Sequence, residues 1–192
     1  MRAHVLYAHP VETSYCAALH SRVVDQLAAA GHEVDDFDLY AAGFEPLLSR
    51  AERLAYHDIP DNRQTVSDCV DRLLAAEALI LVFPVWNFGF PAILKGYFDR
   101  VFLPGVSFRM EDGVVQPNLD NLRRIVAVTT YGGTRLRAWM MGDPPRRLVK
   151  RLLNVTAPNA RVSYHALYDM NRADDRRRSA FLDRAGHAMR TI

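Results

Sequence analysis

The stretch of sequence that decides the fold covers residues 83–102 and reads FPVWNFGFPAILKGYFDRVF. It follows residues 78–82, ALILV, a short apolar run without alternation that is typical of a strand buried on both faces of a parallel sheet. Pro84 cannot continue a hydrogen-bonded ladder, so we expect the strand to end there. The aromatic residues beyond it form either a surface for a planar, partly apolar ligand or a turn whose side chains fold back into the core. This stretch alone leaves both interpretations open.

Length and composition favour one domain over residues 1–192. The chain has 192 residues, of which 49% are apolar, enough for a substantial core. The formal net charge of +2 gives no support to a nucleic acid as the main partner. Cys16 and Cys69 form neither a C-x-x-C pair nor a metal spacing with histidine, which favours a reduced, cytoplasmic protein without a metal site. The amino-terminal apolar run is too short for a signal peptide, and none approaches the roughly 20 residues of a membrane span.

Strand-like and helix-like patterns alternate along the chain. The predicted strands are residues 3–8, 34–39, 78–82, 124–130 and 161–168. The predicted helices are residues 14–31, 49–56, 65–76, 92–103 and 143–153, with a last one that begins at 174. Asp112 and Gly113 predict the turn of a surface hairpin within residues 104–119, and Asp143 with Pro144 predicts a helix cap and first turn.

This alternation predicts an α/β fold with a doubly wound five-stranded parallel sheet in the order 2-1-3-4-5 and helices on both faces. Such a sheet binds ligands at the carboxyl ends of its strands, where the strand order reverses. The loops that meet there are residues 9–15, 84–90 and 129–134.

The first of these loops offers a phosphate site. It contains neither G-x-G-x-x-G nor G-x-x-x-x-G-K-[ST], so it is neither a dinucleotide fingerprint nor a nucleoside-triphosphate loop. It has Thr13, Ser14 and the amides of Tyr15 and Cys16 at a helix start, with His9 nearby. Free N–H groups and hydroxyls at a helix start hold a phosphate well. The alternative is an ordinary serine or threonine cap.

The loop after the fourth strand reads TTYGGT from Thr129. Its two glycines allow backbone amides to approach a ring closely, and Tyr131 stands beside them, although a plain turn is the alternative. A phosphate site, an aromatic surface and a glycine-rich wall at one switch point are together what flavin mononucleotide needs. The combination therefore favours a flavin site.

The same motifs resemble those of the flavodoxin-like NAD(P)H:quinone oxidoreductases of the DT-diaphorase type. Ancillary quinone reductases of potassium efflux systems and azoreductases are related to that family. The matching segments are YAHPVETSYCAAL from Tyr7, FPVWNFGFPAILKGYFDRVF from Phe83 and VTTYGG from Val128. The second segment is the specific one, and the likeness runs from the first strand to about Gly133 and is weak beyond it.

The resemblance implies three groups of flavin-binding residues. The phosphate and ribityl chain would be held by His9, Ser14, Tyr15 and Cys16. The isoalloxazine would be flanked by Pro84, Val85, Trp86, Asn87 and Phe88, and its other edge closed by Thr129, Thr130, Tyr131, Gly132 and Gly133. Cys16 stands where the family often has asparagine, so the phosphate grip would rest more on the backbone and on Ser14.

The resemblance also implies the reaction. The flavin would take a hydride from NAD(P)H and return it to a quinone in the same place, in a two-electron, ping-pong sequence, with azo and nitroaromatic compounds as side substrates. Animal members have a tyrosine and a histidine after the glycine loop to steady the reduced ring, but residues 134–147 contain no histidine. The candidates for this catalytic role are Tyr131, Gly132, Gly133 and Arg135, with Arg137 as a further arginine in the window.

Other features leave choices open. The short carboxyl-terminal part favours FMN over FAD. The basic run Arg146, Arg147, Lys150 and Arg151 either meets the 2′-phosphate of NADPH or is a solvated helix face. Five side chains within residues 97–110 are more apolar than a surface segment usually is: Tyr97, Phe98, Phe102, Phe108 and Met110. They line either the interface of the homodimer that the resemblance implies or the core of the domain. For Tyr97 and Phe98 we favour the core.

Two other classes of function remain. A flavodoxin-type electron carrier would also bind flavin, but such carriers are generally strongly acidic, and a net charge of +2 argues against it. An ancillary flavin-binding subunit of a membrane transporter would act mainly on its partner. The sequence does not distinguish NADH from NADPH or name the physiological acceptor.

Overall fold

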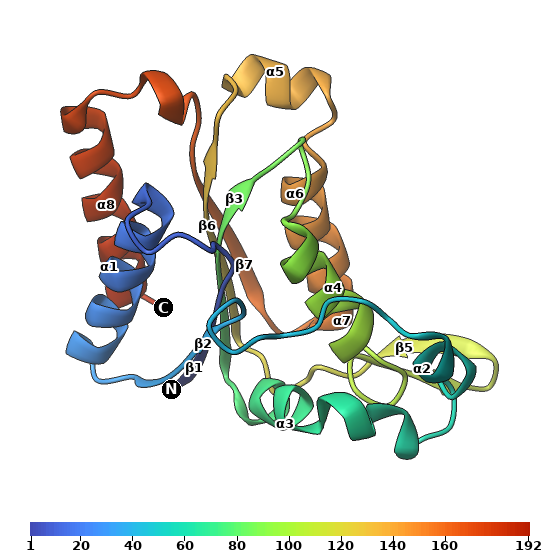
Figure 1. Cartoon of the computed structure of the whole chain (residues 1–192). Coiled ribbons are helices and arrows are strands. Elements are labelled where there is room, and N and C mark those ends of the chain that lie inside the picture. The colour runs from blue at the N-terminus through green and yellow to red at the C-terminus, as the bar shows by residue number, and fades with distance from the viewer.

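The computed structural model describes all of residues 1–192, and a parallel five-stranded sheet lies at its centre (Figure 1). Its order is β2-β1-β3-β6-β7, which is the predicted 2-1-3-4-5 order once the surface hairpin is left out of the count. The strands are β1 (Arg2–Tyr7), β2 (Glu33–Asp38), β3 (Ala78–Val85), β6 (Arg124–Tyr131) and β7 (Arg161–Leu167). The predicted doubly wound flavodoxin-like fold is confirmed.

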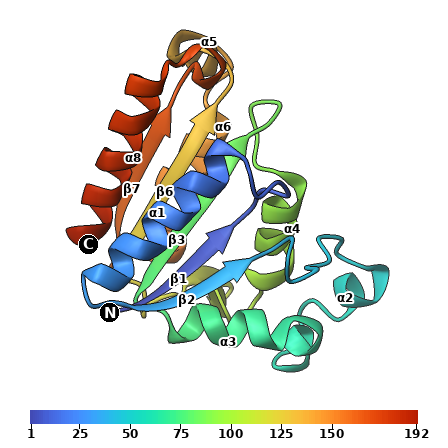
Figure 2. The ribbon, with the colours of Figure 1, turned by 60° about the vertical axis from the view of Figure 1, so that its left-hand side comes forward.

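Helices cover both faces of this sheet (Figure 2). One face carries α1 (Tyr15–Ala29) and α8 (Asp175–Arg190), which pack on a core cluster that includes Val5, Ile80 and Val128. The other carries α3 (Ser67–Ala75), α4 (Ala92–Val101), α6 (Pro144–Arg147), η2 (Leu148–Leu152) and α7 (Leu153–Thr156). The shorter elements are α2 (Arg50–Leu54), η1 (Asp61–Val66), α5 (Arg135–Met140) and η3 (Met170–Arg172).

The predicted surface hairpin is present and projects from the sheet (Figure 1). It consists of β4 (Phe108–Glu111) and β5 (Val114–Pro117), which pair antiparallel. Asp112 and Gly113 have φ angles of +50° and +77°, the left-handed pair that a tight hairpin turn requires.

The prediction that the third strand ends at Pro84 is wrong, because β3 continues to Val85. Val82 turns its carbonyl toward β1, where it accepts a hydrogen bond from the amide of Ala8. Pro84 lies two residues further and faces the same way, beyond the end of β1. Since no strand lies there to receive an N–H, the proline costs the sheet no hydrogen bond.

The segment after the glycine loop also differs from expectation. Residues 135–140 form α5, for which the sequence analysis predicts no helix. Asp143 precedes α6 as predicted, but its side chain does not cap the helix, because it lies in the left-handed region and its carboxylate bonds elsewhere. None of the helices combines the length and apolar character that crossing a bilayer would require.

Candidate functional site

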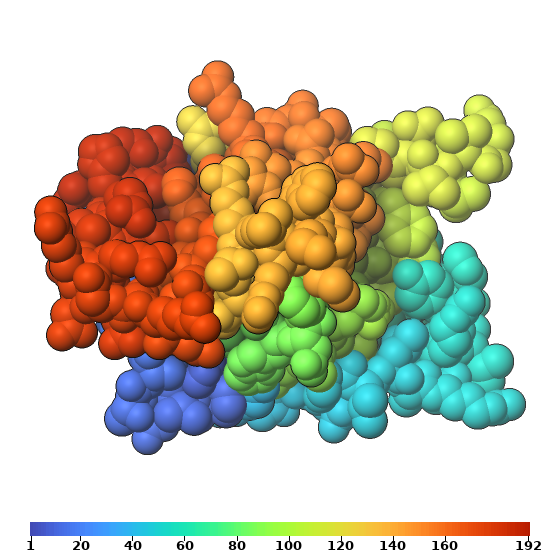
Figure 3. Space-filling view, turned by 90° about the horizontal axis from the view of Figure 1, so that it is seen from above, coloured from blue at the N-terminus to red at the C-terminus, as the bar shows by residue number.

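The carboxyl edge of the sheet has a step between β1 and β3. β1 pairs with β3 as far as Tyr7 opposite Val82, whereas β3 pairs with β6 as far as Val85 opposite Tyr131. β3 and β6 therefore extend beyond β1. Figure 3 looks onto this edge, where the segments after β1 (blue), β3 (green) and β6 (orange) lie side by side. The three predicted loops thus share one face of the molecule.

The loop after β1 leads directly into the first turn of α1. Ser14 caps this helix, and its Oγ accepts a hydrogen bond from the amide of Ala17 at 3.1 Å. Tyr15 and Cys16 occupy the first two helical positions, where N–H groups have no acceptor within the helix. These amides and the Ser14 hydroxyl proton can therefore bind an anion at the positive end of the helix.

The side chains of Tyr15 and Cys16 have other roles. The Tyr15 hydroxyl donates to the carbonyl of Arg178 at 2.7 Å, which ties α1 to α8. The Cys16 thiol is buried in the core, and burial raises its pKa to about 12. These two predicted site residues can serve a ligand through their backbone amides.

The loop after β3 ends in a tight turn. Trp86 and Gly89 exchange backbone hydrogen bonds of 3.2 and 2.8 Å. Between them, Asn87 and Phe88 have φ angles of +47° and +58°. A bulky residue such as phenylalanine is rare in this left-handed region, and such strain is often found at ligand sites.

The aromatic residues of this loop divide between surface and core. Trp86 is 41% exposed. Phe90 instead packs edge-on against Phe83, with ring centroids 5.0 Å apart, and against Phe98 at 5.4 Å. Each interpretation of this stretch therefore holds for part of it: Trp86 offers a surface, while Phe90 folds back into the core.

The loop after β6 has bare backbone at its tip. The Thr129 hydroxyl is buried and donates to the Phe83 carbonyl at 2.6 Å, and Thr130 is buried as well. Gly132 is exposed. The Gly133 carbonyl accepts from the amide of Asp169 at 2.8 Å, which anchors the loop to the segment after β7. The hydrogen bonds of Thr129 and Gly133 therefore fix the backbone of this loop at the carboxyl edge of the sheet.

Tyr131, a predicted catalytic residue, has a buried hydroxyl that is already bonded. It donates to the Asp143 carboxylate at 2.5 Å and lies 2.7 Å from the Tyr164 hydroxyl. Burial, the Tyr164 hydroxyl and the hydrogen bond to Asp143 all raise the pKa of Tyr131, so its proton is retained. The Tyr131 side chain secures the loop, whereas Gly132 at its tip is exposed. Arg135, also predicted as catalytic, lies in a neighbouring cleft with Trp139 and Asp143.

Tyr7 is a residue at this edge that the sequence analysis does not single out. Its hydroxyl is buried and forms no hydrogen bond of normal geometry, although the Ser14 hydroxyl lies near enough to act on it. Burial outweighs the effect of Ser14 and raises the pKa of Tyr7 to about 12. Its ring stacks on His20 at 4.2 Å, and a hollow of about 530 Å³ opens beside both rings and His9. The sequence feature that could have identified Tyr7 is its hydroxyl-bearing side chain at the end of an apolar strand. An orphaned hydroxyl beside a helix start suits a ligand with oxygen acceptors.

These observations fit a flavin. Free amides and a hydroxyl at a long helix start suit its phosphate, and an exposed indole and exposed glycine backbone on the same face of the molecule suit its ring. No three histidine, cysteine or acidic side chains gather where they could hold a metal ion.

Comparison with known proteins shows the family to which the chain belongs. The family model described as flavodoxin-like fold matches residues 1–185, and the chain belongs to that family. It is 32% identical over 148 residues to NAD(P)H dehydrogenase (quinone) 1 of Rattus norvegicus, a match that covers 68% of this chain and 54% of the rat protein. The chain spans about half the length of the curated relatives it matches. The predicted membership of the NAD(P)H:quinone oxidoreductase family is confirmed.

Solved structures agree over the whole chain. An NAD(P)H:quinone oxidoreductase from Methanothermobacter marburgensis superposes with a TM-score of 0.84 at 27% identity, covering 99% of this chain and 98% of that one. An FMN-dependent NADH-azoreductase from Bacillus anthracis, solved with FMN, superposes with a TM-score of 0.75 at 16% identity, covering 99% and 96%. The second likeness shows the shared fold alone.

Proposed function

We propose that this protein is a flavin-dependent NAD(P)H:quinone oxidoreductase. The observation that carries the proposal is the step at the carboxyl edge, where the segments after β1, β3 and β6 lie side by side and Trp86 and Gly132 are exposed. The curated and solved relatives with quinone reductase names support the substrate class. FMN is the proposed form, in keeping with the FMN of the azoreductase neighbour.

In this proposal each loop has one task. Ser14 and the amides of Tyr15 and Cys16 bind the phosphate, helped by the helix dipole. Trp86 covers part of the ring and excludes water from it. The amides of Gly132 and Gly133 stabilise negative charge that develops on the ring edge.

A bound flavin would supply the chemistry, which is hydride transfer from NAD(P)H to a quinone. The chain's part is to position both substrates on the same exposed ring face, so that they bind in turn rather than together. Ping-pong kinetics follow from this shared place. Azo and nitroaromatic compounds, being planar acceptors, are proposed side substrates.

A second copy of the chain is the proposed partner. Tyr97, Phe98 and Phe102 are buried, so these three belong to the core. Exposed apolar side chains instead lie on the hairpin and on the helical run after α6: Met110, Val114, Val115, Leu152 and Val155. A groove of about 460 Å³ lies beside α4 and is lined by Phe98, Phe102, Phe108 and Leu152 among others. The groove and these exposed apolar side chains suit a homodimer, and Val115→Glu should shift the solution mass to that of one chain.

Steady-state kinetics test the proposed activity. Initial rates measured over a grid of NAD(P)H and quinone concentrations should give parallel double-reciprocal lines. Intersecting lines would require both substrates to bind together and would overturn the shared ring face. A flavodoxin-type carrier would bind flavin but react poorly with NAD(P)H, and an ancillary subunit would show its main effect on a copurifying transporter.

A further inference from the structure

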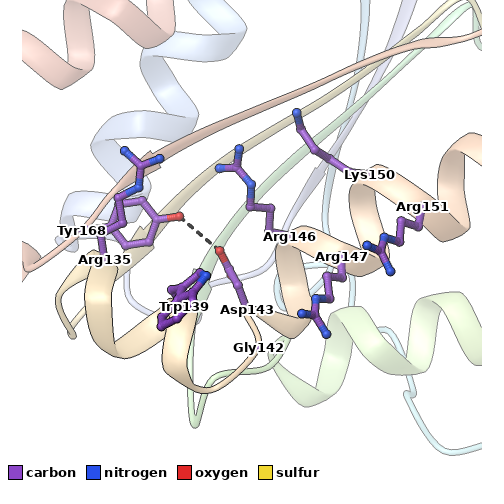
Figure 4. A pocket seen from close by; sticks show the side chains of 9 residues that line it. All are labelled: Arg135, Trp139, Gly142, Asp143, Arg146, Arg147, Lys150, Arg151 and Tyr168. Carbon is purple, nitrogen blue, oxygen red and sulfur yellow. Dashed lines mark hydrogen bonds between the residues drawn. The ribbon is translucent and has the colours of Figure 1, made fainter.

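A basic cleft separates α5 from the helical run that begins with α6 (Figure 4). Its volume is about 330 Å³. Arg135 reaches it from α5, and four cations reach it from the other side: Arg146, Arg147, Lys150 and Arg151. The sequence analysis leaves these four either as a solvated helix face or as a phosphate site, and the structure gathers them around one cavity.

None of these five cations forms an ion pair within the chain. The single carboxylate in the cleft, that of Asp143, accepts hydrogen bonds from Tyr131 at 2.5 Å and from Tyr168 at 3.3 Å. Positive charges packed on one wall repel one another, which costs stability unless an anion binds. A solvated helix face would spread its charges and intersperse acids, so the arrangement favours an anion site.

The local backbone concentrates these charges. Gly142 has a φ angle of +79° and lets the chain turn sharply between the two walls, with the Arg147 guanidinium 3.5 Å from the position of an added Cβ. Lys150 and Arg151 lie in η2, a π-helical segment. Such segments are rare and are often found at functional sites.

An aromatic surface completes the cleft. Trp139 lines it and is 74% exposed, which is unusual for an indole that has no ligand or partner. Its flat face, next to arginines, suits a nucleobase, because bases stack well on indole rings and phosphates pair with guanidinium groups.

The cleft also adjoins the candidate flavin site. Thr134 ends the glycine loop and caps α5, and Arg135 follows it directly into the cleft. Tyr131, at the end of β6, bonds to Asp143 in the cleft wall. A dinucleotide whose nicotinamide lies at the Gly132 rim can therefore extend its adenosine end toward Trp139.

We propose that this cleft binds the adenosine 2′-phosphate end of NADPH, with the adenine on Trp139 and the 2′-phosphate among Arg147, Lys150 and their neighbours. The inference rests on the proposed function and deepens it, because it assigns the preferred hydride donor. A dianionic 2′-phosphate matches the unpaired charge, whereas NADH has only its diphosphate and lacks the group that would lie among these cations.

The double variant Arg147→Gln/Lys150→Gln tests this assignment. It should lower kcat/KM for NADPH by about tenfold or more, while kcat/KM for NADH changes less than about twofold. The matched control, Arg123→Gln/Arg161→Gln, removes two positive charges at the opposite end of the sheet and should leave the NADPH preference unchanged. Trp139→Ala should raise KM for both dinucleotides, since both carry adenine.

A binding measurement separates this inference from the proposed activity. Adenosine 2′,5′-bisphosphate should bind the wild-type protein in calorimetry, more weakly at high salt, and about tenfold more weakly to the double variant. Absence of binding to the wild type, or equal losses for NADPH and NADH in the variant, would overturn the cleft assignment. Bisphosphate binding without oxidation of either dinucleotide would leave the cleft in place and overturn the oxidoreductase proposal instead.

Discussion

The imidazole of His9 lies against the indole of Trp86, with ring centroids 5.6 Å apart and planes inclined by 59°. His9 follows β1 and Trp86 follows β3, so this contact joins two loops across the step in the sheet edge. His9 is itself held by the amide of Val11, which donates to its Nδ1 at 3.0 Å. The exposed indole is therefore placed by a neighbouring loop as well as by its own turn.

Removing this indole should weaken ligand binding without unfolding the protein. Trp86→Ala is expected to raise the flavin Kd by about 5- to 30-fold, which corresponds to the loss of about 1–2 kcal/mol of ring contact, and to raise KM for quinone. Flavin fluorescence quenching measures the first effect, and circular dichroism should show an unchanged fold. Trp139→Ala, which removes the other exposed indole, should leave flavin affinity within about twofold. Wild-type turnover by Trp86→Ala would refute the role of Trp86.

Gly132→Val should lose the flavin because the added side chain crowds the ring at the rim. A Cβ at this position would also lie 3.3 Å from Asn171 Nδ2, so displacement of Asn171 is a competing cause. The double variant Gly132→Val/Asn171→Ala removes that neighbour and distinguishes the two. We expect it to stay without pigment in absorption spectra. Full colour in Gly132→Val would contradict the placement of this loop, and restored colour in the double variant would assign the effect to Asn171.

Tyr131→Phe tests whether this tyrosine acts through its hydroxyl in the reaction or in the fold. The substitution leaves the Tyr164 hydroxyl without its 2.7 Å partner and Asp143 with Tyr168 alone. The free energy of unfolding should fall by about 1–3 kcal/mol in urea titrations. Tyr168→Phe, which removes a longer hydrogen bond of 3.3 Å, should cost less. Unchanged stability together with lost turnover would place the Tyr131 hydroxyl in the chemistry.

A buried ion pair should make stability depend on acid pH. Glu52 of α2 pairs with Arg100 of α4 at 2.5 Å, and their side chains are 13% and 9% exposed. Burial acts to raise the pKa of Glu52, but hydrogen bonds from Thr65, Ser49 and Arg100 outweigh it and lower the pKa from 4.5 to about 2. Because the folded-state pKa is the lower one, this stabilisation is present above about pH 4.5 and is lost as the pH falls toward 2.

Glu52→Gln should therefore cost roughly 3 kcal/mol of unfolding free energy at neutral pH and flatten the loss of stability below pH 4.5. Asp99→Asn is the matched control, because Asp99 pairs with Lys95 at the surface, where the two side chains are 45% and 54% exposed. Its effect should stay below about 0.5 kcal/mol. Parallel acid profiles of the wild type and Glu52→Gln in urea unfolding would contradict this assignment.

The sequence predicts the sheet well because its signals are local. The apolar run that begins at Ala78 predicts a strand buried on both faces, and these residues are buried. Asp112 and Gly113 predict a tight turn, because few other residues adopt the positive φ angles that it requires. The end of β3 is different. Whether Pro84 ends the strand depends on how far β1 extends beside it, and that depends on the tertiary structure rather than on the local sequence.

The directions in which side chains of the candidate site point could not be predicted from the local sequence pattern either. Cys16 and Tyr131 are both predicted site residues, yet both side chains are buried, because neighbouring positions of a helix or a strand point in different directions, some into the core. The basic cleft depends on α5, whose six residues are too few to show a helical period. The cations after Pro144 could be read in the sequence, but the opposing Trp139 wall could not.

The central claim is that the loops after β1, β3 and β6 together hold a flavin. The most direct measurement is the absorption spectrum of the purified protein after incubation with excess FMN and removal of unbound FMN by gel filtration. We predict one bound flavin per chain, with the visible band bleached by NADPH and restored by a quinone. Protein that emerges colourless from this treatment would contradict the claim.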